Sequence, residues 1–430
     1  MAAGFGVLAA GTRPLPRPRP LPRLRTSTYM PTLPLWYHGY MPEQQTPTFQ
    51  LIADNRSLSA AVQELCSYSV IAVDTEFMRE KTYQAQLCLL QLASSDRGYI
   101  IDPLTGIDLK ILTELFYDSN IVKVFHAGYQ DMEILFHLLG QPPTPVFDTQ
   151  IAASMLGQPQ QISLAALIKS YLGIELYKGD TFSDWSKRPL RDTQLNYAFD
   201  DVRYLPQIYT TMHDRLVSSG RLSWLNDEFN ALSSPGRYLE TPEKLWQRLK
   251  GHNNLNRRQL GVLQQTAIWR DNTARRRDLP RKWVVTDEQL IDIARRSPTT
   301  LDELYQTRGI REKISVVSAR ELLAAVQSGL TMPEGDLPER PRKPANANEA
   351  TAAIDLMQAL VHLRATEQHI PASVLASADD LRALASGHTS GLSILRGWRR
   401  ELIGNELLDL LAGDLVLSLD QGRLLIEKKR

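Results

Sequence analysis

Three apolar runs lie close together in the first quarter of the chain, and they constrain the fold more than any other feature. The runs span residues 69–77, 85–94 and 97–103, with only short segments between them. Each has the length and apolar content of a β-strand. Connections this short join antiparallel neighbours, because a parallel crossover needs about a dozen residues or more. The sequence therefore predicts an antiparallel meander here.

Other parts of residues 46–235 also follow the periodicity of strands or helices. Strands are predicted at 48–54, 120–126 and from 146 onward, and helices at 57–66, 108–118, 128–140 and 162–173. Residues 176–190 show no period and are predicted as a loop. A helix is expected from Arg191 past Tyr209, with a kink at Pro206. We interpret residues 46–235 as one α/β domain.

The rest of the chain is predicted to be helical. Residues 239–330 and 351–425 carry helical patterns of similar size without a convincing strand, and we interpret them as two all-α domains in a weak internal repeat. Residues 331–350 between them are rich in proline and charged residues, which is typical of a linker.

Residues 1–45 form a Pro- and Arg-rich leader that is predicted to be disordered, because its composition cannot build a core. Its apolar stretch precedes its charges, which is not the layout of a signal peptide, and its prolines do not favour a transit peptide. We interpret residues 1–40, upstream of Met41, as a translated leader with no role in the fold.

Composition and charge narrow the class of protein. No apolar run approaches the roughly 18 residues of a membrane span. Cys66 and Cys88 lack the spacing of a metal site, which favours a reducing cytoplasm. The chain has 49 Lys and Arg against 48 Asp and Glu, and five of the Arg lie in residues 1–40, so the remainder has a net charge of −4. Nucleic-acid binding must therefore depend on local patches and metal ions.

Two carboxylates stand at the end of the first apolar run. Asp74 and Glu76 are alternate residues of the predicted strand, so their side chains point to the same face. Two like charges this close are costly unless a cation lies between them. An isolated pair of this kind is more often a strand end that dips into solvent, so other residues must decide its meaning.

Three other residues, which lie later in the sequence, favour a functional site. Asp131 lies in the first turns of a predicted helix, next to Gly128, which leaves space for a ligand. Tyr197 and Asp201 are four residues apart on a later predicted helix and so share a face. Acids near helix starts are common, because the helix dipole favours them. The signal is therefore the whole set rather than any one member.

Four carboxylates without His or Cys form a set of hard oxygen ligands. Such a set suits Mg²⁺ or Mn²⁺ rather than zinc. Two such ions, about 3.5–4 Å apart, activate a water and stabilise the leaving oxygen in phosphodiester cleavage. We therefore expect two divalent metal ions, Mg²⁺ or Mn²⁺, as cofactors.

The motifs DTEF, HAGYQD and Y-x3-D, in this order, resemble the three exonuclease motifs of the DEDDy 3′→5′ exonucleases. The segments TYQAQLCLLQL and DWSKRPL resemble the ribonuclease D branch, and the helical remainder is similar to the HRDC domains that follow its catalytic domain. The resemblance covers residues 48–425. It implies an RNase H-like fold, with a mixed sheet flanked by helices, and a 3′→5′ exoribonuclease that releases nucleoside 5′-monophosphates, as in tRNA 3′ maturation.

The resemblance also implies a role for each motif residue. Asp74 would bridge both metals, and Glu76 and Asp201 would complete the site that activates water. Asp131 would hold the other metal, partly through water. Tyr197 would orient or deprotonate the attacking water, and orientation is favoured because a tyrosine ordinarily has a pKa of about 10. We expect a cytoplasmic monomer that acts on RNA with a single-stranded 3′ end.

Five further residues are predicted to contact the substrate: Phe77, Met78, His126, Trp185 and Arg188. Flat or apolar groups stack beside a terminal base, although core packing explains the first two almost as well. For His126, core packing or a supporting hydrogen bond is the favoured alternative. Trp185 and Arg188 lie in the predicted loop before the third motif, where RNA contact and anchoring of the loop are equally favoured.

A basic segment follows the predicted catalytic domain. Between Lys244 and Lys282 there are eleven Lys or Arg and only two acids. The same segment contains Trp246, Trp269 and Trp283. We expect its cations to contact RNA and its tryptophans to pack in the core. The alternative for the cations is a solvated helix face.

Two other functions stay open from the sequence. The same acids would serve a DNA exonuclease, because the 2′-OH is sensed by other groups. No polymerase-sized region and no phosphate-binding helicase loop follows the motifs, which weighs against this alternative. The complete set of acids weighs against a non-catalytic RNA-binding adaptor.

Overall fold

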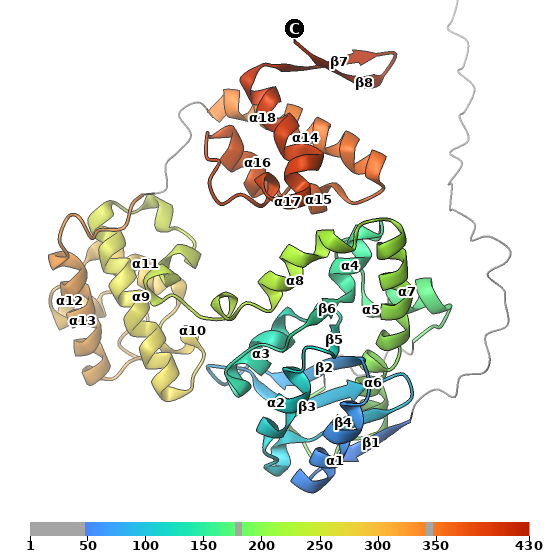
Figure 1. Ribbon diagram of the computed structural model, residues 1–430. Coiled ribbons are helices and arrows are strands. Elements are labelled where there is room, and N and C mark those ends of the chain that lie inside the picture. Colours follow the sequence, from blue (N-terminus) through green and yellow to red (C-terminus); the bar gives the residue numbers. More distant parts are fainter. Residues whose placement is uncertain (1–47, 177–182, 341–346, 430) are drawn as a thin grey trace, which may run out of the picture. The chain divides into compact units, whose positions relative to one another are not determined.

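The computed structural model describes residues 48–176, 183–340 and 347–429 (Figure 1). The predicted leader, residues 1–45, lies outside the described residues, as do residues 341–346 of the predicted linker and 177–182 of the predicted loop. Among the helices of the described ranges, none is both long enough and apolar enough to cross a membrane.

A six-stranded mixed sheet forms the centre of the first part of the chain (Figure 1). Its strands are β1 (Phe49–Ile52), β2 (Val70–Met78), β3 (Gln86–Ala93), β4 (Gly98–Ile101), β5 (Val122–Phe125) and β6 (Val146–Asp148). They lie in the order β1-β4-β3-β2-β5-β6. Strands β2, β3 and β4 pair antiparallel in succession, which confirms the predicted meander, whereas β1–β4, β2–β5 and β5–β6 pair in parallel.

Helices cover both faces of this sheet. They are α1 (Asn55–Leu65), α2 (Thr113–Phe116), α3 (Tyr129–Leu139), α4 (Thr149–Met155), α5 (Leu164–Leu172), α6 (Asp192–Arg203), α7 (Leu205–Ser218) and α8 (Asn226–Leu232). Ile71 and Val73 of β2 belong to the apolar cluster with α1, α2 and α3, whereas Ala72 belongs to the cluster with α4 to α7. Successive residues of β2 therefore face different helices.

The helix expected from Arg191 past Tyr209 is two helices, α6 and α7, which meet at Tyr204. Pro206 lies in the first turn of α7, where a missing N–H leaves no helical hydrogen bond unmade. Helix α6 packs against β2, β3 and β4. Because the expected helix is divided, the separate helix α6 packs on the sheet and carries the third motif.

Residues 257–331 form a helical unit. Its helices are α9 (Arg257–Arg277), α10 (Arg281–Val284), α11 (Asp287–Arg296), α12 (Leu301–Tyr305) and α13 (Val316–Thr331). Helices α9 and α13 meet at Gly329, where an added Cβ would lie 2.4 Å from Val262 Cα. The first half of the predicted linker packs on this unit as well, because Leu337 is buried and its carbonyl accepts a hydrogen bond from Arg257.

The last unit departs from the expected all-α architecture in one element. Its helices are α14 (Ala347–Gln368), α15 (Ala372–Leu375), α16 (Ala378–Ala385), α17 (Gly397–Arg399) and α18 (Asn405–Ala412), followed by strands β7 (Leu415–Asp420) and β8 (Arg423–Lys428). The two strands pair antiparallel around Gln421 and Gly422, which both have positive φ. A two-residue turn with two positive φ values is the preferred hairpin connection, so the alternating residues around it form strands.

Short turns of helix complete the described elements. Short 3₁₀ helices lie at Pro103–Thr105, Leu109–Leu112, Leu222–Leu225, Pro235–Arg237, Pro242–Arg248, His252–Asn254 and Ser393–Leu395, and a π turn lies at Arg400–Gly404.

Candidate active site

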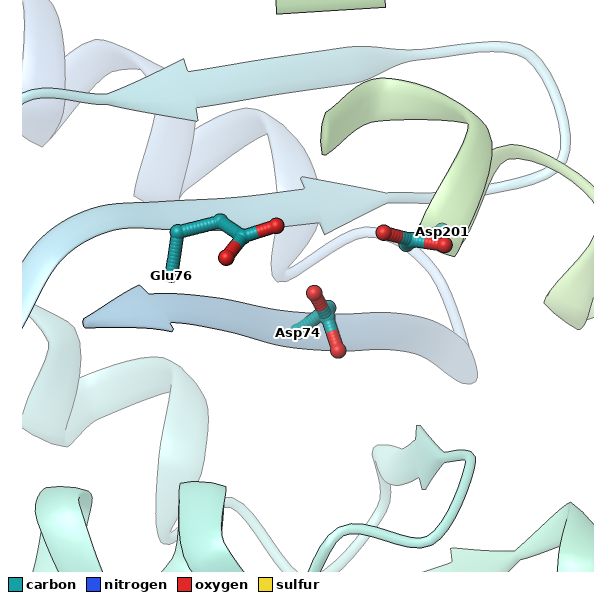
Figure 2. Close-up of side chains that lie close together, drawn as sticks. All are labelled: Asp74, Glu76 and Asp201. Atoms are coloured by element: carbon teal, nitrogen blue, oxygen red, sulfur yellow. The ribbon is translucent and has the colours of Figure 1, made fainter. Parts of the chain in front are cut away.

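Three carboxylates converge beside the sheet. Asp74 and Glu76 come from β2, and Asp201 comes from α6. One oxygen of each carboxylate lies within 4.8 Å of the other two, and Figure 2 shows the three groups gathered around a common space. In the described part of the chain, this is the one group of three or more acidic, His or Cys side chains placed to hold a metal ion.

The local structure explains why these acids meet. Asp74 and Glu76 alternate on β2 and so project to the same face, and the ladder with β3 shifts register directly after Glu76. Helix α6 packs on this face, and Tyr197 lies one turn before Asp201. Asp200 is engaged elsewhere, since its carboxylate pairs with Arg203 at 3.1 Å.

Asp131 lies beside this group but is not one of the three converging acids. It is buried in the first turn of α3, and its carboxylate accepts a hydrogen bond from the Thr75 hydroxyl. Its charge contributes to the raised pKa of Asp74, of Glu76 and of Asp201, so it shares their electrostatic environment. The predicted space at Gly128 is filled by Phe125, whose Cβ would lie 2.5 Å from a Cβ added to the glycine.

Burial raises the pKa of all four acids, and repulsion by neighbouring site acids adds to this for Asp74, Glu76 and Asp201. Burial, followed by the charges of Asp131, Asp201 and Glu76, raises the pKa of Asp74 well above its ordinary value. Burial and the neighbouring acids raise the pKa of Glu76 to about 8 and that of Asp201 to about 7. Burial raises the pKa of Asp131 to about 6. A site that repels its own charges this strongly is suited to a divalent cation.

The chemistry of these donors fits hard metal ions. Every converging ligand is a carboxylate oxygen, the donor that Mg²⁺ and Mn²⁺ prefer, and no thiolate or imidazole belongs to the group. Thr75 is the participant that sequence reasoning missed. Its position between two acids of one strand was the available signal, because it must face the opposite side of β2 and therefore α3.

The chain is similar to known proteins over most of its length. A sequence model described as 3′–5′ exonuclease matches residues 49–217, and one for the HRDC domain matches residues 259–326. A ribonuclease D of Sphingobium indicum is 39% identical over 379 residues, which are 87% of this chain and 97% of that protein. The chain belongs to the ribonuclease D family. A family member from Granulibacter bethesdensis is 37% identical, over 87% of this chain and 95% of its own.

Solved structures agree with membership of the ribonuclease D family. Escherichia coli RNase D, described as an exoribonuclease involved in structured RNA processing, matches with a TM-score of 0.77 and 32% identity, over 85% of this chain and 99% of its own. The catalytic core of RRP6 from Trypanosoma brucei matches with a TM-score of 0.53 and 27% identity, over 66% and 80% of the two chains. The predicted family, fold class and 3′–5′ exoribonuclease activity are confirmed, and this exonuclease fold implies divalent metal ions.

The predicted substrate contacts lie in different environments. Phe77 and Met78 are half-buried, each packed against a different apolar cluster. The two ring nitrogens of His126 hydrogen bond to the Thr149 hydroxyl and the Ile162 carbonyl, at 2.9 Å and 3.0 Å. These contacts leave only the edge and face of the ring for a ligand.

Two residues of the loop before the third motif are held by the fold. Trp185 is only 4% exposed, and its ring centroid lies 6.2 Å from that of Tyr197. Arg188 forms a two-pronged ion pair with Asp102, at 2.6 Å and 2.7 Å, and also donates to the Cys88 carbonyl. These contacts anchor the loop beside the third motif.

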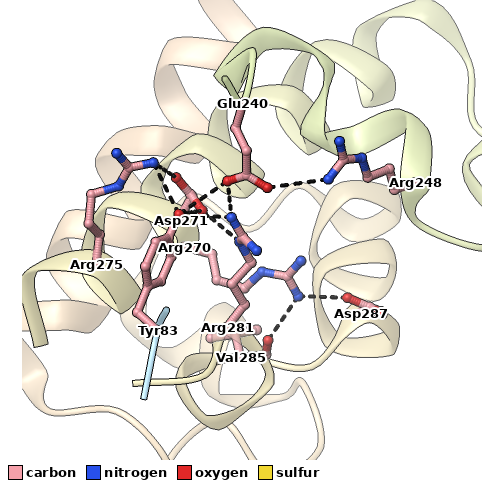
Figure 3. A network of polar contacts seen from close by, with 9 residues as sticks. All are labelled: Tyr83, Glu240, Arg248, Arg270, Asp271, Arg275, Arg281, Val285 and Asp287. Atoms are coloured by element: carbon pink, nitrogen blue, oxygen red, sulfur yellow. Dashed lines mark hydrogen bonds and ion pairs between the residues drawn. The ribbon is translucent and has the colours of Figure 1, made fainter. Parts of the chain in front are cut away.

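Many cations of the basic segment are paired with acids or carbonyl groups. Figure 3 shows Arg281 and Arg275 against Asp271, and Arg270 against Asp287. Tyr83, from the loop after β2, joins this network by donating to Asp271 at 2.8 Å. Paired cations have less charge available for phosphates.

The tryptophans of the basic segment divide between core and surface. Trp246 and Trp269 pack in the apolar core of the helical unit at residues 257–331, as expected. Trp283 does not, because 54% of it is exposed.

Proposed function

We propose that this protein is a metal-dependent 3′→5′ exoribonuclease whose active site is formed by Asp74, Glu76, Asp131, Tyr197 and Asp201. The observation that carries the proposal is the convergence of Asp74, Glu76 and Asp201, whose carboxylate oxygens lie within 4.8 Å of one another. Membership of the ribonuclease D family supports the choice of reaction.

Each acid has a distinct task in this proposal. Asp74 would hold both ions, while Glu76 and Asp201 would hold the ion on the side of the attacking water. Asp131, fixed by Thr75, would support the second ion. When bound, two divalent ions supply a hydroxide near neutral pH and neutralise the charge of the leaving oxygen.

Tyr197 is the proposed orienting group for water. It lies one helical turn before Asp201 on α6, which packs against β2, and this spacing supports a phenol that faces the same site. Trp185 packs near its ring and limits its movement. A phenol held this way accepts or donates one hydrogen bond to the nucleophile and so selects its direction of attack.

We propose that the substrate is RNA with a single-stranded 3′ end, such as a tRNA precursor, and that the product is a nucleoside 5′-monophosphate. Escherichia coli RNase D, an exoribonuclease involved in structured RNA processing, supports this class of substrate. Residues 239–330 and 351–425 would serve as accessory HRDC-like domains after a catalytic domain at 46–235. The enzyme would act as a cytoplasmic monomer with Mg²⁺ or Mn²⁺.

The substrate contacts proposed are Phe77, Met78, His126, Trp185 and Arg188. The first two lie directly after the acids on β2, which supports contact with the terminal base. Trp185 and Arg188 would act by holding the loop next to Tyr197, since both are engaged by the fold.

The test measures nucleotide release from a 3′-labelled RNA overhang and from a DNA overhang of the same sequence. We expect release of 5′-monophosphates from RNA with Mg²⁺ or Mn²⁺, and none with EDTA. Asp74→Asn and Asp201→Asn should each abolish release, whereas Asp200→Asn, beside the site but paired with Arg203, should retain it. Equal cleavage of DNA would favour the DNA exonuclease alternative, and activity of Asp74→Asn would refute the proposed site.

A further inference from the structure

Gln91 of β3 lies directly opposite Asp74 in the antiparallel ladder between β2 and β3. Opposite residues of such a pair project to the same face, with Cβ atoms about 4.5–5.5 Å apart. The Gln91 side chain therefore lies on the face of the sheet that carries Asp74 and Glu76. It is fully buried there, with no exposed surface.

The amide of Gln91 has unmet hydrogen-bonding capacity. Among the described residues, neither its nitrogen nor its oxygen has a hydrogen-bond partner. A buried amide without partners is costly, and such groups in native structures call for a functional or structural explanation. An apolar side chain of the same length would fill this position without that cost.

The neighbours of Gln91 on this face leave few partners for its amide. Its other opposite residue, on β4, is Ile100, and α6 contributes Ala198 and Phe199 to the apolar cluster on this face. Within the ladder, Asp74 is therefore the one directly opposite residue that can exchange hydrogen bonds with it.

We propose that Gln91 is a positioning residue for Asp74: when the metal ions are bound, its amide nitrogen, which has no partner within the residues that the structure describes, would donate a hydrogen bond to the Asp74 carboxylate and hold that carboxylate in its metal-ligating orientation. The inference rests on the proposed function and deepens it. A ligating carboxylate presents a defined oxygen to the metal only if its own rotation is restrained, and removal of such a supporting partner typically lowers metal affinity about 10- to 100-fold.

A purely structural role gives a different expectation. If the amide only fills space, or binds a buried water, replacing it with an apolar side chain of equal length leaves the metal affinity unchanged. The proposed role explains why the amide lies opposite Asp74 and not elsewhere in the apolar cluster.

The experiment titrates the metal-free full-length chain with Mn²⁺, without RNA, and measures free Mn²⁺ by electron paramagnetic resonance. Gln91→Met preserves the length of the side chain and removes the amide. Leu89→Met is the matched control, because Leu89 lies on the same strand opposite Glu76 and is equally buried. We expect Gln91→Met to weaken Mn²⁺ binding about tenfold or more, and Leu89→Met to bind as the wild type does.

Kinetics provide a second readout. At limiting Mn²⁺, Gln91→Met should show a lower kcat with an unchanged KM for RNA, and excess Mn²⁺ should restore part of kcat. Circular dichroism establishes that the variant folds, and Gln91→Leu replaces it if it does not. Wild-type Mn²⁺ affinity in the folded variant would overturn the role of Gln91 and leave the proposed function intact. Absence of Mn²⁺ binding by the wild type would instead overturn the proposed function.

Discussion

The Thr75 hydroxyl donates a hydrogen bond to the Asp131 carboxylate, and this contact joins the strand of the first motif to the helix of the second. Thr75 lies between Asp74 and Glu76 but faces the other side of β2. One strand therefore presents two acids to α6 and, with the residue between them, fixes a third acid on α3.

Replacement of Thr75 by valine tests this contact. Thr75→Val keeps the shape of the side chain but leaves the buried Asp131 carboxylate without its hydroxyl partner. We expect kcat on labelled RNA to fall about tenfold or more, as for other residues that support metal ligands. Thr75→Ser retains the hydroxyl and should keep most of the activity. Full activity of the valine variant would mean that Asp131 is positioned without this hydrogen bond.

The repulsion among the acids predicts an unusual dependence of stability on pH in the metal-free protein. Folding raises the pKa of Glu76 to about 8 and of Asp201 to about 7, whereas unfolded acids titrate at about 4. Between these values the folded chain binds more protons than the unfolded chain, so its stability decreases as pH rises. We expect the Tm in EDTA to fall between about pH 5 and pH 8.

Two measurements check the origin of this effect. Glu76→Gln removes one of the raised acids, so its Tm in EDTA should depend less on pH than that of the wild type. Addition of Mg²⁺ should raise the wild-type Tm most at the upper end of the range, where the ligands are ionised. If the Tm of Glu76→Gln in EDTA depended on pH as strongly as that of the wild type, the pH dependence would originate outside the site.

The contact between α9 and α13 predicts a large loss of stability on a minimal substitution. In Gly329→Ala the added Cβ would lie 2.4 Å from Val262 Cα, so the two helices must move apart. We expect the free energy of unfolding to fall by about 1–3 kcal/mol in urea titrations. Gly335→Ala is the control, because a Cβ there meets no atom within 4 Å. Equal stability of the two variants would contradict this packing.

The Tyr83 hydroxyl predicts a smaller effect on stability. It lies among Asp271, Arg275 and Arg281 (Figure 3), and Tyr83→Phe removes the hydroxyl alone. We expect a loss of only about 1 kcal/mol in the free energy of unfolding, because Arg275 and Arg281 still pair with Asp271 when the hydroxyl is removed. Tyr129→Phe, at a residue that is 43% exposed, should be neutral. A neutral Tyr83→Phe would indicate that the charged groups pair equally well without the hydroxyl.

The sequence predicted the parts of the fold that depend on local pattern. Apolar content and spacing located the β2–β3–β4 meander, because strands joined by so few residues pair antiparallel. The hairpin at Gln421 and Gly422 was missed, because its strands are short and follow a long helical region. Its signal was the alternation of residues 415–420 and 423–428 around a glycine-containing pair.

Side-chain partners could not be predicted from the sequence, because they depend on contacts between distant segments. The pairing of Arg188 with Asp102 joins residues 86 positions apart, and no periodicity indicates it. The same holds for Trp185, whose burial depends on α6. Convergence of Asp74, Glu76 and Asp201 was expected from motif resemblance, whereas the hydrogen bond between Thr75 and Asp131 required coordinates.

The division of β2 between two faces limits how this protein can change during evolution. Substitution of its apolar residues alters packing by degrees, but insertion or deletion of a single residue before Asp74 would rotate every following side chain to the opposite face. Asp74 and Glu76 would then enter the apolar layer beneath α1, α2 and α3, and Thr75 would take their place. The number of residues in this strand before Asp74 is therefore as tightly constrained as the identity of its two acids.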